Sequence, residues 1–244
     1  NFIITNRQAT HPIVHFHTLF SKKPFVGATM AISSHLTLLT GIAGINVYIV
    51  RILKLPFDIS LHFYFFFFVG VIITGILKMF FYSSVGAGFL GTLGSSALLY
   101  VSIHWIILGN TINIPLLYIQ GLLLGFGASM TLVSGSMATL LDGDLKEAAQ
   151  RSQTMHTMRN FSAAMLIPII AYTIKNHIQK GTQSIYAENI TDKMIYLKKL
   201  QDVAIDADHQ IFLLMIIFNM VMFVSSIIQM ILGKGRRITP PRES

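Results

Sequence analysis

The sequence of 244 residues contains no cysteine. A disulfide framework and a thiolate metal site are both excluded, because each requires cysteine sulfur. The same absence removes the usual indication of whether a chain belongs to an oxidising or a reducing compartment. The compartment therefore has to be inferred from other features of the sequence.

Charged residues are scarce. They make up 11% of the chain, whereas 53% of the residues are hydrophobic and the mean hydropathy is +0.63. Soluble domains usually carry about 25% charged residues. The formal net charge of +8 suggests nucleic acid binding at first sight, but the basic residues lie in short segments beside long apolar runs. That distribution is typical of membrane topology, so the sequence predicts an all-α polytopic membrane protein without a nucleic acid partner.

Six apolar runs predict six transmembrane helices. A helix needs about 20 apolar residues to cross a hydrocarbon core of about 30 Å, and five of the runs meet this length. The fifth run is shorter and needs the polar turns before it, and Pro168 predicts a kink within it. The runs cover residues 25–50, 59–81, 86–109, 114–141, 161–174 and 211–232.

The segments between the runs predict domain organisation and orientation. Lys and Arg are concentrated before the first run, after the fourth and in the tail, and the positive-inside rule places these segments in the cytoplasm. We expect a multi-pass protein of the cell membrane, the bacterial inner membrane, with both termini cytoplasmic. The predicted parts are a cytoplasmic entry loop (1–24), five helices with short loops (25–174), a long extracytoplasmic loop (175–210), a sixth helix (211–232) and a basic tail (233–244).

Acidic residues are absent from all six runs. A proton-driven carrier needs a carboxylate or a histidine whose charge can change within the working pH range, and the runs supply only histidines. His35 lies at the middle of the first run, in a polar stripe with Ser33, Ser34 and Thr37. We therefore name His35 as the proton-coupling candidate. The alternative is a buried histidine that only serves packing.

Small residues predict close helix packing. Gly121 and Gly125 form a G-x-x-x-G step in the fourth run, a spacing that allows two helix backbones to touch. We assign these two glycines to helix packing rather than to substrate contact.

The order of these features resembles the second half of a major facilitator superfamily transporter, and within that superfamily the fourteen-span drug:proton antiporter-2 family. The resemblance covers residues 11–232, and its motifs lie in residues 11–20, 118–127 and 144–162. Two departures stand out. Only Gly75 and Lys78 remain of the charged motif between the family's tenth and eleventh spans, and Ser162-Ala163-Ala164 stands where glycines are common.

The resemblance implies a single six-helix bundle, the C-terminal half of a proton-coupled multidrug efflux transporter that works by alternating access. The motifs of the first half are absent and the chain begins with Asn1, so we expect a fragment that does not transport alone. The implied partners are the missing N-terminal half, membrane lipid, protons, small amphipathic or cationic drug-like substrates and a periplasmic adaptor. Neither a cofactor nor enzymatic activity is expected.

The resemblance also implies a set of site residues. Gly75, Lys78 and Arg159 form the expected cytoplasmic gate. The expected cavity wall comes from the first, second, fourth and fifth runs, where apolar, aromatic and methionine side chains adapt to varied ligands. The substrate-binding candidates are His35, Thr37, Asn46, Phe63, Phe66, Gln120, Ser129, Met130, Ser134 and Asn160.

Two other classes of protein fit parts of the sequence. The first is a self-sufficient six-span carrier or channel that acts as a dimer. The second is a membrane-embedded metalloenzyme, because His11, His15 and His17 offer imidazoles at helical spacing. Pro12 interrupts that spacing and no acidic partner follows, so a solvated loop is the simpler interpretation of these histidines.

Overall fold

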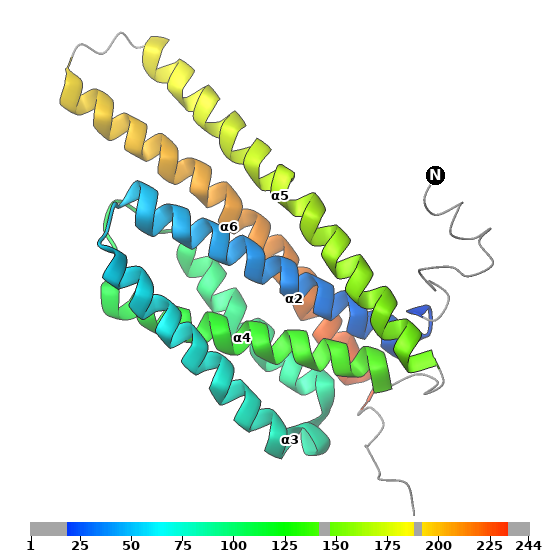
Figure 1. Ribbon diagram of the computed structural model, residues 1–244. Coiled ribbons are helices and arrows are strands. Elements are labelled where there is room, and N and C mark those ends of the chain that lie inside the picture. The colour runs from blue at the N-terminus through cyan, green and yellow to red at the C-terminus, as the bar shows by residue number, and fades with distance from the viewer. Residues whose placement is uncertain (1–18, 142–146, 188–191, 234–244) are drawn as a thin grey trace, which may run out of the picture.

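The computed structural model describes residues 19–141, 147–187 and 192–233, and within them the chain is almost entirely helical. The predicted entry segment up to residue 18, with His11, His15 and His17, and the basic tail from residue 234 lie outside the described residues. The elements are α2 (Lys22–Asn46), the π-helical η2 (Val47–Ile52) that continues it, α3 (Phe57–Trp105), α4 (Ile114–Leu141), α5 (Ala148–Ala187) and α6 (Lys193–Ile231) (Figure 1).

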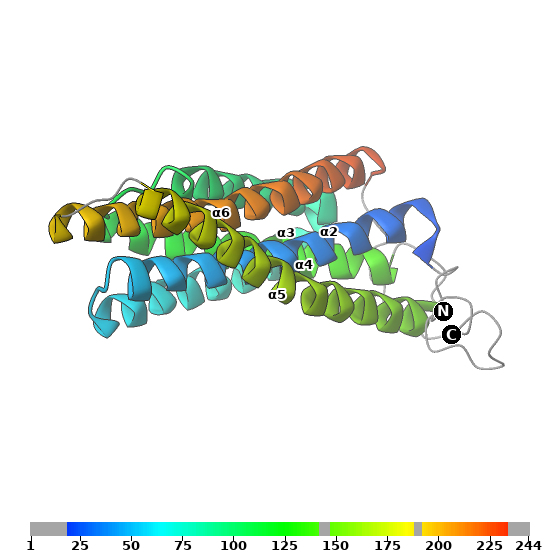
Figure 2. The same ribbon diagram turned by 90° about the horizontal axis from the view of Figure 1, so that it is seen from above.

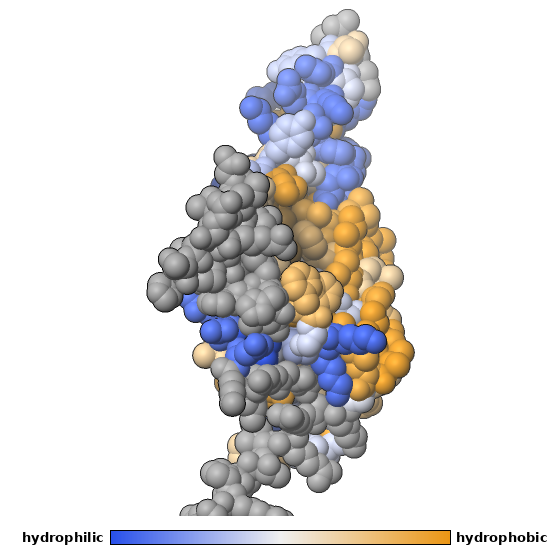
Figure 3. All heavy atoms as spheres, turned by 90° about the vertical axis from the view of Figure 1, so that its right-hand side faces the viewer, coloured by the Kyte–Doolittle hydropathy of each residue, from blue (hydrophilic) through white to orange (hydrophobic). Residues whose placement is uncertain are grey.

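Within the part of the chain that the structure describes, four helical stretches are long and apolar enough to cross a membrane. They are Lys22–Ile52, Phe57–Trp105, Ile114–Leu141 and Lys193–Ile231. Large apolar side chains also face outwards, most regularly along α3, at Phe57, Leu61, Phe65, Phe68, Ile72 and Ile76. An apolar surface of this kind is the one a membrane protein presents to lipid. Figure 3 shows apolar side chains gathered over one face, below the polar tip of the molecule.

The prediction of six separate transmembrane helices in one bundle of the major facilitator type is wrong. Within the described residues the structure contains five α-helices, because the runs 59–81 and 86–109 belong to the single helix α3 of 49 residues. The expected loop between them is replaced by one non-helical residue, Gly86. In addition, α5 is not among the helices apolar enough to cross, since polar turns precede its apolar part.

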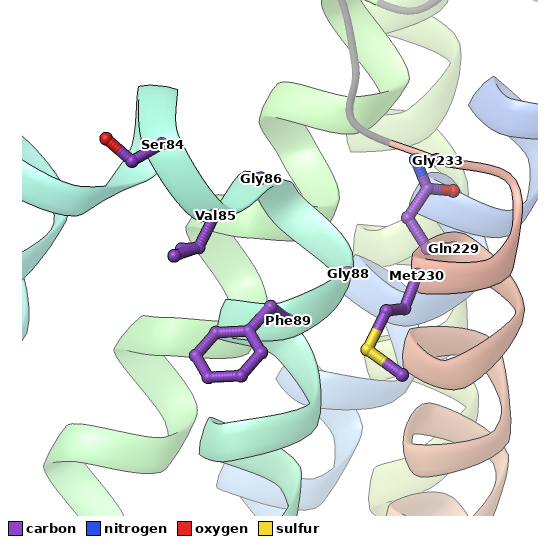
Figure 4. Close-up of a pocket in the computed structure, with 8 residues that line it drawn as sticks. All are labelled: Ser84, Val85, Gly86, Gly88, Phe89, Gln229, Met230 and Gly233. Carbon is purple, nitrogen blue, oxygen red and sulfur yellow. The ribbon is translucent and has the colours of Figure 1, made fainter.

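Gly86 folds α3 back on itself. Its backbone angles, φ 82° and ψ 170°, lie in a region that is essentially restricted to glycine. A straight helix of this length would extend for about 74 Å at 1.5 Å per residue. Instead, the two arms return alongside each other, because the ring centroids of Phe63 and Trp105 lie only 6.3 Å apart. Figure 4 shows the bend, with Ser84 and Val85 before it and Phe89 after it.

Substitution of Gly86 tests this bend. We expect Gly86→Ala to lower the free energy of unfolding by about 1–3 kcal/mol, because a Cβ atom disfavours the observed backbone angles. Gly109→Ala is the matched control, since Gly109 has no atom within 4 Å of an added Cβ and no positive φ. Thermal midpoints of the two variants in detergent provide the measurement. Equal midpoints would show that residue 86 is not held in this conformation.

The core lies where both arms of α3 meet α2, α4 and α6. Trp105, at the end of α3, is fully buried in this core, and its ring lies 5.3 Å from that of Phe212 on α6. Its indole Nε1 donates to Gln120 Oε1 on α4 at 2.8 Å. At the opposite end of the molecule, Lys23 Nζ donates to the carbonyl oxygen of Gly233. The start of α2 and the end of α6 therefore lie together.

Helices α5 and α6 form a long antiparallel pair that extends past the other helices (Figures 1 and 2). Helix α5 continues to Ala187 and α6 begins at Lys193. Residues 175–187 and 193–210, expected as loop, are thus helical. The two helices support each other there, as the contact of Tyr186 with Tyr196 shows. Helix α5 also continues without interruption through Pro168.

The other predicted domain bounds stay predictions.

The glycines of α4 bring this helix against the first arm of α3. A Cβ atom at Gly121 would lie 2.9 Å from the Phe63 carbonyl oxygen, and one at Gly125 would overlap the Phe67 carbonyl oxygen. The two backbones therefore touch over one helical turn, which is the arrangement that the G-x-x-x-G spacing allows.

Candidate functional site

The buried polar groups of α2 and α4 face each other near the start of α5. The two helices run antiparallel, because Gly27 lies against Gly135 whereas Ser34 lies against Ala128. At their contact, Ser34 Oγ and Thr131 Oγ1 are 2.6 Å apart and share a hydrogen bond. Both residues belong to polar stripes at helical spacing, which place hydroxyl groups on the facing sides of the two helices.

Two hydroxyl groups, one turn to either side of this pair, have no hydrogen-bond partner among the described residues. Thr37 lies one turn after Ser34 on α2, and Ser134 lies one turn after Thr131 on α4. Both side chains are fully buried, and neither Thr37 Oγ1 nor Ser134 Oγ makes a hydrogen bond. A buried polar atom without a partner is unusual in a native structure and costs about 1–3 kcal/mol. Each hydroxyl thus retains an unused donor and acceptor in the helix packing.

Helix α5 adds positive charge at this junction. Arg159 interacts electrostatically with His35 of α2 and with His156 of its own helix. The Arg159 side chain is partly buried, and its Nε atom is buried without a hydrogen-bond partner. We name the group formed by Ser34, His35, Thr37, Thr131, Ser134 and Arg159 the α2–α4–α5 junction.

Arg151 connects the first turn of α5 to the end of α4. Its side chain is fully buried. The guanidinium donates from Nε to the Thr139 carbonyl oxygen at 3.0 Å and from Nη2 to the Leu140 carbonyl oxygen at 2.9 Å. These carbonyls have no partners within the helix because they belong to its last turn. Arg151 therefore caps α4 and fixes the position from which α5 carries Arg159.

The structure does not gather all the predicted site residues at the junction. His35 interacts electrostatically with Arg159 there, and Thr37 and Ser134 follow one turn to either side of the Ser34–Thr131 pair. Asn160 is exposed one residue beyond Arg159 on α5. Ser129 lies on α4 at the far side, where its carbonyl oxygen accepts a hydrogen bond from Lys78 Nζ. Gly75 is exposed and an added Cβ would contact nothing within 4 Å. The predicted gate residues therefore lie on different sides of α4.

The remaining predicted residues belong to the packing between other helices. Phe63 and Gln120 contact Trp105 in the core, and Met130 is fully buried against Gly94. The Phe66 ring stacks on Tyr118 at 5.4 Å. Asn46 forms a side-chain hydrogen bond with Tyr64. The substrate roles of these five predicted residues stay predictions.

Sequence reasoning missed a deeply buried carboxylate. Asp208 is 1% exposed and lies within α6. It was overlooked because residues 175–210 were expected to be a solvated loop. The signal was present in the sequence, since Ile205, Asp208, Phe212 and Met215 follow a helical spacing that continues the apolar run upstream. The buried pairs of Trp105 with Gln120 and of Asn219 with Ser102 were also not foreseen.

Within residues 19–141, 147–187 and 192–233, no three His, Asp or Glu side chains lie close enough together to hold a metal ion. The junction instead offers hydroxyl oxygens, one imidazole and one guanidinium in apolar surroundings. Such a set can bind a polar group of an amphipathic molecule.

Comparison with known proteins adds no family to these observations. No protein-family model matches the chain, and no curated protein matches it.

Proposed function

We propose that this chain is one half of a proton-coupled membrane carrier for small amphipathic molecules, as its resemblance to a drug:proton antiporter implies. The observation that supports this most directly is the α2–α4–α5 junction. There, Thr37 Oγ1 and Ser134 Oγ lie one turn to either side of the Ser34–Thr131 pair and have no hydrogen-bond partner among the described residues. The partly buried Arg159 interacts electrostatically with the neighbouring His35. Polar and charged groups inside a membrane protein are costly and usually mark a pathway for a substrate or an ion.

The orientation of the proposed carrier follows from its basic residues. Lys23 lies beside Gly233, and Arg151 caps the end of α4 that packs against the start of α2. Basic residues are thus concentrated at this end of the molecule. The positive-inside rule places such an end in the cytoplasm, so we propose that α2 begins and α6 ends at the cytoplasmic face of the cell membrane.

The charges near the junction narrow the class of substrate. Arg159 carries a positive charge, and helix α5 itself contains no acidic residue. The acid just before this helix, Glu147, lies 3.8 Å from Arg151. A cationic substrate would be repelled by this wall unless the other half of the carrier supplied an acid. An amphipath with a neutral or negatively charged polar group fits the wall directly. We propose the latter class.

The proposal is tested by measuring transport by the full protein that contains this chain. Everted membrane vesicles with an imposed proton gradient are supplied with an anionic or a cationic fluorescent amphipath of similar size. We expect proton-dependent uptake of the anionic dye. Arg159→Gln should lower that uptake about tenfold, because a hydrogen bond to a charged group contributes about 1.5–3 kcal/mol and about 1.4 kcal/mol is a factor of ten.

Lys175→Gln is the matched control, since Lys175 is a basic residue on the same helix, away from the junction. Its uptake should equal that of the unmodified protein. The proposal fails if neither dye is transported in response to the gradient. The substrate class is wrong if the cationic dye alone is transported, or if Arg159→Gln and Lys175→Gln behave alike.

A further inference from the structure

Asp208 occupies an unusual position at the end of the core opposite Lys23. Its side chain is 1% exposed, and its neighbours on the same face of α6, Ile205 and Phe212, both belong to the main hydrophobic core. Phe212 packs on Trp105 and against Gly44 of α2. The carboxyl group is therefore held among apolar side chains rather than at the surface.

Neither oxygen of the Asp208 carboxyl group has a hydrogen-bond partner among residues 19–141, 147–187 and 192–233. Neighbouring polar side chains are paired: the Tyr48 hydroxyl donates to the Gly109 carbonyl oxygen, and His209 Nε2 donates to the Leu108 carbonyl oxygen at 2.8 Å. Both partners belong to the segment after α3. The segment after α3 thus provides hydrogen-bond acceptors for Tyr48 and His209, but no described residue donates a hydrogen bond to Asp208.

The surrounding charges do not compensate for this burial. Tyr48 of η2 interacts electrostatically with Asp208, but a neutral phenol supplies no positive charge. The titratable groups within two turns of Asp208 on α6 are Asp202, Asp206 and His209, and the neighbouring turns of η2 and α3 carry Arg51 and His104. On α5, whose Thr173 lines a pocket together with Gln210 of α6, they are Lys175 and His177. No hydrogen bond joins any of these described residues to the Asp208 carboxyl group.

We propose that Asp208 is a proton-binding site, neutral while α6 is packed against η2 and α3, and able to release its proton when these elements separate. Burying an ionised carboxylate without a partner costs far more than burying the neutral acid, because the charge loses its hydration. A metal ion is a poorer occupant, since no three ligating side chains gather among the described residues. A proton requires only the carboxyl group.

This site is separate from His35, the predicted coupling residue, which lies at the α2–α4–α5 junction. In linking the Asp208 proton to transport, the inference rests on the proposed carrier function. Separation of α6 from η2 would expose the carboxyl group to water, and repacking would require a proton. Alternating opening of this kind couples a proton to a movement of helices. The binding of the proton itself does not depend on transport.

Infrared difference spectroscopy of the purified full chain in detergent tests proton binding directly. At neutral pH the unmodified protein should show the carbonyl stretching band of a protonated carboxylic acid, shifted in heavy water. Asp208→Asn should remove this band. Asp206→Asn, which changes an exposed acid two residues away, should retain it. The amide that Asp208→Asn introduces resembles the neutral acid in size, so the variant is expected to fold.

The pH dependence of stability provides a second measurement. A buried acid favoured in its neutral form stabilises the folded chain at low pH, and this contribution is lost as the pH rises. The thermal midpoint should therefore fall with rising pH in the unmodified protein and in Asp206→Asn, and fall less in Asp208→Asn. Proton binding by Asp208 is overturned if the infrared band is absent at neutral pH, or if the band persists in Asp208→Asn. It is also overturned if the thermal midpoint depends on sodium and this dependence is lost in Asp208→Asn. None of these results depends on whether the protein transports a dye.

Discussion

Gly125→Leu should prevent the chain from folding into a stable form. A side chain at this position would overlap the Phe67 backbone, which cannot move without breaking the contact between α3 and α4. Overpacking of a rigid site costs about 1–3 kcal/mol when side chains can yield, and more when backbone must shift. We expect a loss of at least about 3 kcal/mol, which is a large part of the total for a protein of ordinary stability.

The single tryptophan provides the measurement. Trp105 is fully buried in the core that this contact supports, so its emission reports whether the core is formed. Gly125→Leu should shift the emission towards that of exposed tryptophan and broaden the size-exclusion profile in detergent. Gly75→Leu is the matched control, because Gly75 is a helical glycine with no atom within 4 Å of an added Cβ. Similar behaviour of the two variants would show that α4 does not approach α3 at Gly125.

Arg151→Met should have the second large effect on stability. It removes the two hydrogen bonds to the Thr139 and Leu140 carbonyl oxygens at the end of α4. Each carbonyl left without a donor in a buried position costs about 1–3 kcal/mol. We therefore expect the free energy of unfolding to fall by about 2–5 kcal/mol, with a lower thermal midpoint in detergent.

Glu147→Gln separates this cap from the ion pair made by the same arginine. Glu147 lies 3.8 Å from Arg151 Nη1, and its side chain is 41% exposed. Ion pairs with an exposed partner contribute about 0–1 kcal/mol, so this variant should retain nearly all of the stability. If Glu147→Gln lowers the midpoint as much as Arg151→Met does, the ion pair rather than the backbone cap holds α4 and α5 together.

The helices themselves follow closely from local sequence. Helix α4 has the bounds that its apolar run predicts, Ile114–Leu141, because hydropathy and chain length decide whether a segment can cross a bilayer. The sequence indicates a break between the second and third runs near Gly86, but it does not indicate that a single residue makes this break. Similar sequences can form either a loop or a turn at a single glycine with positive φ. Only the packing of both arms of α3 shows that one residue makes the turn.

The candidate site could be predicted in part. The polar stripe of the first run indicates His35 and Thr37, and in the structure Ser34 of this stripe contacts Thr131 of α4. Arg159 was selected from a motif and lies near His35. Phe63 and Gln120, which the resemblance implied as parts of the cavity wall, pack in the core around Trp105. The rotation of a helix about its axis depends on its neighbours, which hydropathy does not describe.

The sequence by itself determined that this is an all-helical chain with the composition of a membrane protein, because hydrophobicity and helix length are local properties. Tertiary structure alone decided that α3 folds back at Gly86, that Arg151 caps α4, and that Asp208 is buried without a partner. These features arise from contacts between residues far apart in the chain. The environment of a side chain, and with it the chemistry of that side chain, is set by such contacts.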